Sequence, residues 1–284
     1  MASTRDIRRR IRSVQSTRKI TKAMKMVSAA KLRRAQERML AARPYAHRME
    51  DVLGSLAARA NPELHPLLAI RPEERIELVV LTADKGLCGS FNTNVLKRAQ
   101  ALLLEKREKV KGIHCIGKKG RDFFRRRRIT IAGEHVGVFS NVDPEMAAGI
   151  ARGLIDRYSG RDLDAVYLVY NEFKSVIQQR IVAARLLPIE RRQLGEGEVK
   201  EDYIYEPDAH RLLEELLPRH VEFQVYHAML ESAAAEHGAR MAAMDAATSN
   251  ADEMIESLTL FLNRVRQASI TKEIIEVVSG AQAL

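Results

Sequence analysis

The sequence predicts an α/β protein with long helices, in which the N- and C-terminal helices form an antiparallel coiled coil and a three-layer α/β domain lies between them. Residues 1–43 and 219–284 contain no proline and only three aromatic residues, Phe223, Tyr226 and Phe261. Because both segments leave the same central body, their apolar seams are buried most simply against each other. The central residues alternate between strand-like and helix-like segments, as in an α/β domain.

The two outer segments carry opposite charge. Residues 1–50 hold 15 Lys and Arg against 3 Asp and Glu, a net charge of +12, whereas residues 208–284 hold 6 against 12, a net charge of −6. A basic helix and an acidic helix attract each other, which favours their pairing. The remaining positive charge calls for an acidic protein surface, a nucleic acid or a membrane surface, and composition alone leaves these three open.

The first helix begins near Ser3 or Thr4, either of which can cap it. Its expected seam opens with a few apolar residues, shifts phase, and becomes a regular 4, 3 repeat from Ala35 onward. The seam residues are Ile7, Ile11, Val14, Ile20, Met24, Val27, Ala35, Met39, Ala42, Ala46, Met49, Leu53 and Leu56. Pro44 lies off this seam, so we expect a local bend there and the helix end at Asn61-Pro62.

The centre of the chain alternates between the two kinds of element. We expect strands at residues 76–82, 113–116, 165–170 and 175–187, and helices at residues 92–110, 118–128 and 143–158. Asp143-Pro144 is typical of a helix start, and Gly195-Glu196-Gly197 indicates a flexible loop. The β-α-β-α order implies a Rossmann-like, mostly parallel sheet with helices on both faces.

The last helix begins near Pro207-Asp208, and Pro218 predicts a kink in its first turns. Its expected seam near the C-terminus is Met254, Leu258, Phe261, Val265, Ala268, Ile275 and Val278. At 1.5 Å per residue it spans roughly 110 Å against roughly 80 Å for the first helix, so its final turns extend as a single helix. The nearly uncharged end, Val277–Leu284, then needs a socket. We expect a shaft of residues 1–60 and 208–284 and a globular domain of residues 73–206.

Several kinds of protein are excluded. No apolar run approaches 18 residues, so we expect no membrane span, and the basic N-terminus lacks the apolar core of a secretion signal. Cys88 and Cys115 have no metal-ligand spacing and are interpreted as small buried hydrophobic residues. The eight histidines form no H-x-x-x-H or H-E-x-x-H pair, and no Gly-x-Ser-x-Gly elbow occurs. We therefore predict no catalytic residue, no cofactor and no metal site.

Two segments allow rival functions. The loop 82–90 follows the first strand, where nucleotide-binding folds place a phosphate loop, but its spacing fits neither G-x-G-x-x-G nor G-x-x-x-x-G-K-[ST], so we interpret it as a tight turn. The clusters Arg8–Arg10 and Arg125–Arg128 suggest a nucleic-acid surface. In the first helix, however, basic and apolar residues interleave, whereas a DNA-binding basic helix usually precedes its zipper. An acidic protein surface fits this pattern better.

Five segments carry a resemblance to a known family. Residues 20–32 (ITKAMKMVSAAKL), within the similar stretch 7–38, resemble the N-terminal helix of the gamma subunits of F-type ATP synthases. Residues 239–244 (ARMAAM) and 266–273 (RQASITKE) resemble the C-terminal signature of the same subunits. The segments 83–92 and 203–207 also match, so the likeness spans essentially the whole chain.

The resemblance implies a non-catalytic rotor subunit. The coiled coil would turn inside a ring of alpha and beta subunits, and the central domain would stand on the membrane c-ring beside the epsilon subunit. Proton flow would turn the shaft, and its asymmetry would drive the three catalytic sites of other subunits through ATP synthesis. The resemblance also implies a peripheral position at the cytoplasmic face of a bacterial cell membrane, with no nucleic acid bound and no direct membrane insertion.

The resemblance also implies a set of contact residues. Lys22, Met24 and Lys25 would face acidic regions of the beta subunits, although Met24 lies in the apolar stripe and is equally a plain seam residue. The contact set on the opposing helix would be Arg240, Arg266, Gln267, Thr271 and Glu273, with Val277 and Val278 in the apolar tip. The alternatives are a nucleotide-binding α/β enzyme and a coiled-coil nucleic-acid binder.

Overall fold

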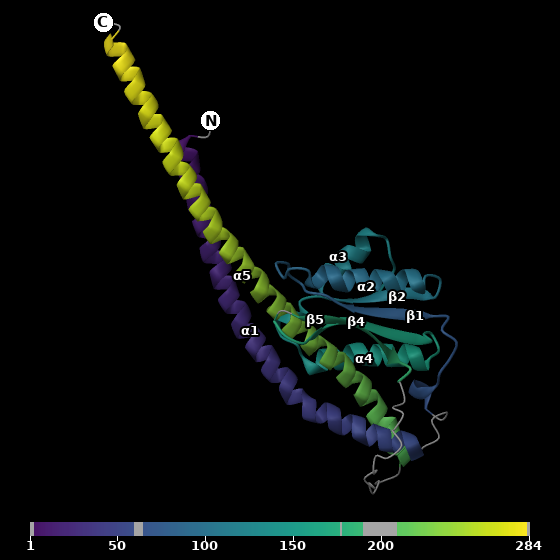
Figure 1. Cartoon of the computed structure of the whole chain (residues 1–284). Helices are drawn as coiled ribbons and strands as arrows, with labels where there is room; N and C mark the ends of the chain where they lie inside the picture. Colours follow the sequence, from purple (N-terminus) through teal and green to yellow (C-terminus); the bar gives the residue numbers. More distant parts are fainter. Residues whose placement is uncertain (1–2, 60–64, 177, 190–208, 283–284) are drawn as a thin grey trace. The chain divides into compact units, whose positions relative to one another are not determined.

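The computed structural model describes residues 3–59, 65–176, 178–189 and 209–282. The chain divides into two compact units, unit 1 with residues 1–28 and 240–284, and unit 2 with residues 29–239. Two long helices, α1 (Thr4–Arg59) and α5 (Ala209–Gln282), each contribute to both units (Figure 1). The division into a shaft of residues 1–60 and 208–284 and a domain of residues 73–206 stays a prediction.

Unit 2 contains a five-stranded sheet with the strand order β3-β2-β1-β4-β5. The strands are β1 (Ile76–Leu81), β2 (Val110–Ile116), β3 (Ile131–His135), β4 (Ala165–Phe173) and β5 (Gln179–Leu187). The first four strands are parallel to their neighbours, and only β5 runs antiparallel, beside β4. The mostly parallel sheet predicted from the β-α order is confirmed.

Helices cover both faces of this sheet. The helices are α2 (Phe91–Glu105), α3 (Lys118–Arg126) and α4 (Pro144–Ser159), with short 3₁₀ turns η2 (Pro66–Leu68) and η3 (Val138–Ser140). Figure 1 shows α2 and α3 on one face and α4 on the other. Alternate residues of β1 serve the two cores: Leu78 and Val80 pack with α2, whereas Val79 and Leu81 pack with α4 and α5. The predicted three-layer arrangement is confirmed.

Local sequence explains the helix and strand positions. All six residues of β1 are buried, five of them apolar and one, Glu77, charged, as expected for a strand covered on both faces. Asp143 caps α4 by accepting a hydrogen bond from the N–H of Glu145, and Pro144 follows at the first helical position. Ser3 caps α1 by accepting from the N–H of Asp6 at 3.3 Å, as predicted.

Several predicted boundaries were wrong. The helix predicted to reach residue 110 ends at Glu105, with Lys106 as its C-cap. It cannot continue to residue 110, because Val110 already pairs with Ile76 as the first residue of β2. The predicted strand 175–187 begins only at Gln179, α3 ends at Arg126, and β3 was not predicted. Asn61-Pro62, Gly195–Gly197, residues 203–207 and the last two residues lie outside the described residues.

The seam of α1 is partly as predicted. In unit 2 its regular half is confirmed from Met39 to Leu53, since Met39, Met49 and Leu53 are 4%, 6% and 8% exposed. The side chain of Leu56 lies outside the described part of the chain. In unit 1 the predicted seam residues Ile20 and Val27 are 58% and 57% exposed, so that part of the prediction was wrong. The helix continues through Pro44, as α5 does through Pro218, so neither proline ends its helix.

Candidate functional site

The buried side of α1 in unit 1 is polar in its middle. Thr21 and Ser28 are 8% and 3% exposed, although the sequence favoured their apolar neighbours as seam residues. The hydroxyls of Thr21 and Thr248 lie 2.8 Å apart, and Thr248 also donates to the carbonyl of Met244. Small polar residues therefore satisfy each other in the seam, and the larger apolar residues point outward.

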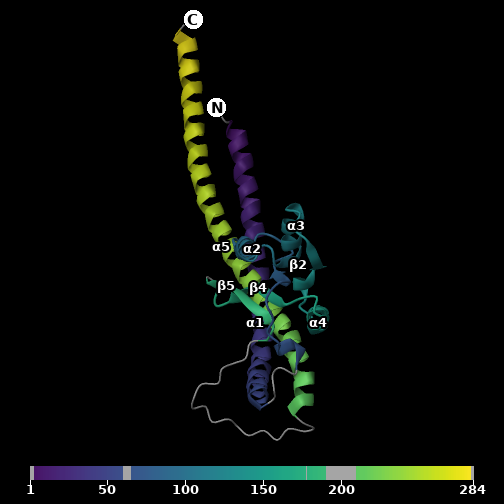
Figure 2. The same ribbon diagram turned by 90° about the vertical axis from the view of Figure 1, so that its right-hand side faces the viewer.

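Two ion pairs flank this polar seam. Arg18 Nη1 lies 2.7 Å from Asp252 Oδ1, and Lys25 Nζ lies 2.5 Å from Asp245 Oδ1. As the residue number rises on α1 it falls by nearly the same amount on α5, which defines an antiparallel pairing (Figure 2). The predicted attraction between a basic and an acidic helix is confirmed for these pairs. Because their side chains are about half exposed, each pair adds little stability and chiefly sets the register.

The seam of α5 in unit 1 is displaced from the predicted one. Leu258 and Val265 are half-buried as expected, but Met254 and Phe261 are 52% and 47% exposed, and Ala268 is exposed. The buried or half-buried positions instead follow a 4, 3 repeat: Met244, Thr248, Ala251, Ile255, Leu258, Leu262 and Val265. The observed seam is rotated about the helix axis relative to the predicted one, so that large apolar side chains such as Met254 and Phe261 face outward.

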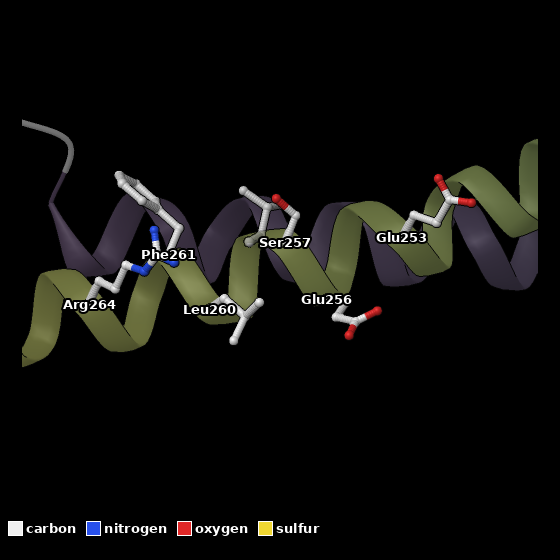
Figure 3. Close-up of a pocket in the computed structure, with 7 residues that line it drawn as sticks. Glu253, Glu256, Ser257, Leu260, Phe261 and Arg264 are labelled. Atoms are coloured by element: carbon white, nitrogen blue, oxygen red, sulfur yellow. The ribbon is translucent and has the colours of Figure 1, made fainter.

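These outward side chains border a shallow groove on α5. The groove has a volume of about 480 Å³ and is lined by Glu253, Glu256, Ser257, Leu258, Leu260, Phe261 and Arg264. Figure 3 shows Phe261 and Leu260 projecting from the helix, with the carboxylates of Glu253 and Glu256 farther along it. Exposed apolar side chains, one of them aromatic, with charged residues at their border are typical of a protein–protein contact.

The C-terminal end of α5 is exposed on every side. All residues from Arg266 to Ser279 are exposed, so α5 outreaches α1 as predicted (Figure 1). The large apolar residues here are Ile270, Ile274, Ile275, Val277 and Val278, exposed by 48–72%. Residues 270, 274, 277 and 278 have the spacing of one helix face. An apolar helix face without a helical neighbour in unit 1 indicates a binding partner.

The predicted contact residues fall into two groups. Lys22, Arg266, Gln267, Thr271, Glu273, Val277 and Val278 are exposed in the structure. Met24 is half-buried, Lys25 is bound to Asp245, and Arg240 is only 9% exposed. The second group therefore already has neighbours within the chain. Sequence reasoning missed the partner of Lys25 because it depends on the register of two helices about 220 residues apart.

The loop 82–90, considered above as a phosphate site, is hydrogen-bonded to other segments of the chain. The carboxylate of Asp84 accepts hydrogen bonds from the N–H groups of Lys118 and Gly137, at 3.0 and 2.9 Å. Lys118 is the first residue of α3, so the Asp84 carboxylate lies at the N-terminus of that helix. The loop 82–90 itself leads into α2, whose N-cap Ser90 makes no side-chain capping hydrogen bond. Ala83 donates its N–H to the side chain of Asn92. The interpretation of this loop as a tight turn stays a prediction.

The Arg125–Arg128 cluster is partly neutralised. Arg125 binds Glu134 at 2.8 Å, and the guanidinium of Arg127 lies 3.6 Å from the centre of the Phe123 ring. Cys88 and Cys115 are buried, as predicted, and burial raises the pKa of the Cys115 thiol to about 12. Among the described residues, no group of three or more His, Cys, Asp or Glu side chains could hold a metal ion. Within that part of the chain, too, no helix is long and apolar enough to cross a membrane.

Comparison with known proteins agrees with this geometry. A sequence profile of the ATP synthase family matches residues 3–284. The ATP synthase gamma chain of Solibacter usitatus (strain Ellin6076) is 56% identical over all of this chain and 99% of its own length. That of Anaeromyxobacter sp. (strain Fw109-5) is 54% identical over the full length of both. The chain belongs to the family of ATP synthase gamma chains.

Solved structures of the family show the same fold. The central stalk of the Tetrahymena thermophila mitochondrial ATP synthase is 27% identical, with a TM-score of 0.62 over 80% of this chain and 99% of that one. The rotor of the Euglena gracilis enzyme is 20% identical, with a TM-score of 0.68 over 94% of this chain and 98% of that one. The family resemblance of the sequence motifs is confirmed.

Proposed function

We propose that this chain is the rotating central shaft of an ATP synthase and couples ion flow across a membrane to ATP synthesis or hydrolysis in other subunits. The surface of unit 1 is the observation that carries the proposal. It is a two-helix coil that continues as one exposed helix, with large apolar side chains facing outward. The exposure of large apolar side chains to water is energetically unfavourable, and a surrounding ring of subunits would remove them from water.

Unequal sides of unit 1 suggest how rotation acts on the ring. Lys22, Ile20 and Val27 are exposed on α1, whereas Glu253, Glu256 and Phe261 are exposed on α5. A ring subunit therefore meets a basic and apolar side or an acidic and apolar side, depending on the angle of the shaft. Rotation changes the free energy of each subunit conformation through these different contacts, which is the physical basis of coupling. No catalytic group of this chain is required.

The proposal includes the partners and the position of the chain. The alpha and beta subunits would surround unit 1, and unit 2 would contact the epsilon subunit and the membrane c-ring. The chain would then be peripheral, at the cytoplasmic face of a bacterial membrane. The exposed residues Lys22, Arg266, Gln267, Thr271, Glu273, Val277 and Val278 would contact the ring directly, as would part of Met24. Lys25 and Arg240 would act mainly by holding the shaft together.

A rotation assay tests this function. The chain is mixed with alpha and beta subunits, the ring is fixed to glass, and a bead is attached to unit 2. We expect ATP to drive stepwise rotation of the bead in one direction. ATP hydrolysis by the assembled complex with a stationary bead would refute the proposal.

The basic side of α1 has a test of its own. Lys22→Glu should reduce proton pumping per ATP in membrane vesicles, because an acidic loop of a beta subunit would then meet a like charge. Lys25→Gln is the matched control, since Lys25 already binds Asp245 within the chain. Equal pumping by the Lys22→Glu variant and the wild type would contradict a contact between Lys22 and an acidic loop of a beta subunit.

The two rival functions predict different binding. A nucleotide-binding enzyme would bind ATP at micromolar concentration as an isolated chain, but the loop after β1 lacks both glycine spacings of such enzymes. A nucleic-acid binder would bind duplex DNA with a steep salt dependence, through counterion release. We expect neither result from titrations of the isolated chain.

A further inference from the structure

One segment of α5 is buried on every side. From Glu231 to Gly238, eight successive residues are buried, and Ser232, Ala234 and Ala235 have no measurable exposure. A surface helix usually buries a single stripe, so this segment must have neighbours all round. In unit 2, α5 runs between α1 and the sheet (Figure 1). We call residues 231–239, the last of unit 2 before α5 enters unit 1, the collar segment.

Two hydrogen bonds attach the collar segment to the β4–β5 hairpin. The carboxylate of Glu231 accepts the backbone N–H of Phe173, the last residue of β4, at 2.8 Å. The side-chain amide of Gln179, the first residue of β5, donates to the carbonyl of Ala235 at 3.1 Å. Glu231 and Ala235 are one helical turn apart. Both strands of the hairpin are thus bound to successive turns of α5.

Close packing restricts the same two turns. A Cβ atom on Gly238 would lie 3.1 Å from Cε2 of Phe173, so the ring lies directly on the helix backbone. Cys88, on the loop after β1, and Phe91, the first residue of α2, form a buried cluster with Ala235. Three separate segments of unit 2 therefore contact the collar segment. Sliding α5 along its axis, or turning it, would break these contacts together.

We propose that torque passes through the collar segment from the rest of unit 2 to unit 1. Glu231 and Gln179 are positioning residues that prevent α5 from slipping against the β4–β5 hairpin. The inference rests on the proposed rotary function. Because α5 is one continuous helix from Ala209 to Gln282, contacts that hold residues 231–239 in place also turn the rest of the helix with them. The bond to Glu231 is charge-assisted and buried, which makes it stronger than a neutral one.

The test uses the complete complex in vesicles and measures protons pumped per ATP hydrolysed. Glu231→Ala removes the acceptor of the Phe173 N–H, and we expect the pumping ratio to fall roughly twofold or more, as for other mutations along a coupled network. Glu231→Gln should restore the ratio, because its amide oxygen still accepts this hydrogen bond. A purely structural loss would lower the amount of complex and leave the ratio unchanged.

Gln179→Ala is a milder second variant, with Gln178→Ala as its control. Gln179 donates to Ala235, whereas Gln178 is exposed and contributes only its backbone to the turn. We expect a lower pumping ratio for Gln179→Ala and a wild-type ratio for Gln178→Ala. Wild-type ratios for both Glu231→Ala and Gln179→Ala would overturn the inference and leave the rotary function intact. Absence of coupled pumping in the wild-type complex would instead refute the rotary function.

Discussion

Unit 2 and unit 1 differ in where their large apolar side chains lie. In unit 2, large residues such as Leu154, Tyr158 and Phe124 are completely buried between the sheet and its helices. In unit 1, the middle of the seam holds Thr21 and Thr248, and large apolar residues face outward. The comparison indicates that unit 2 buries its large apolar side chains within itself, whereas unit 1 leaves such side chains exposed, where the proposed ring of subunits would cover them.

The largest effect should come from breaking a buried ion pair of unit 2. Glu77 is 1% exposed and binds both terminal nitrogens of Arg157 at 2.6 Å. Arg157→Ala would leave this carboxylate buried and deprived of its main partner, and we expect a loss of about 3–5 kcal/mol in the free energy of unfolding at pH 7. Urea unfolding of the isolated chain measures it. A loss below about 1 kcal/mol, the value of a surface pair, would contradict a rigid core at this site.

Acid should produce a smaller effect at the same site. Burial by itself raises the pKa of Glu77, but hydrogen bonds and charge from His114 and Arg157 outweigh it and hold the pKa below its usual range. A lowered folded-state pKa stabilises the fold above the unfolded-state value of about 4, and this contribution is lost as the pH falls through the folded-state pKa. Unfolding measured between about pH 5 and pH 2 should therefore show wild-type stability falling. The difference between wild type and Arg157→Ala should shrink over that range, and a constant difference would exclude Glu77 as the cause.

Unit 1 should respond weakly to the loss of an ion pair. Asp245 and Lys25 are about half exposed, so Asp245→Asn should cost only about 0.2–1 kcal/mol, and less at high salt. Thermal unfolding at two salt concentrations provides the measurement. A cost comparable to that of Arg157→Ala would mean that unit 1 is held together as unit 2 is.

The smallest effect on stability, with a large effect on assembly, is expected on the exposed face of α5. Ile274 is 57% exposed, so Ile274→Ser should change the stability of the isolated chain by no more than about 0.5 kcal/mol. If the ring covers this side chain, affinity for the alpha and beta subunits should fall roughly tenfold. Leu104→Ser is the matched control, because Leu104 is a 73% exposed apolar residue of unit 2, which the proposal does not assign to the alpha and beta subunits. Unchanged affinity for Ile274→Ser would place the contact elsewhere.

The features that the sequence predicted are those set by local patterns. The apolar run of β1 and the Asp143-Pro144 start of α4 each needed only neighbouring residues. β3 was missed because its five residues, IAGEH, include a glycine and form no apolar run. Its position depends on pairing with β2, where Gly133 allows the ring of His114 to approach within van der Waals distance.

The candidate site was less predictable because it depends on the rotation of two helices about their axes. An apolar pattern cannot distinguish Ile20 from Thr21 as the seam residue when the partner position is a threonine. The ion pairs Arg18–Asp252 and Lys25–Asp245 identify Thr21 as the seam residue, but they can be recognised only when the register between the two helices is known. The outward apolar face of α5 follows from that same rotation.

Hydrogen–deuterium exchange, compared between the isolated chain and the complex assembled with alpha and beta subunits, tests the contrast between the two units most directly. In the isolated chain we expect slow exchange in β1 and β4 and fast exchange at residues 266–282. On assembly, the largest gain in protection should fall on α5 from Met254 to Val278, with the sheet of unit 2 almost unchanged. If assembly protected the sheet and left this part of α5 exchanging as fast as before, unit 1 would not be the surface that meets the ring.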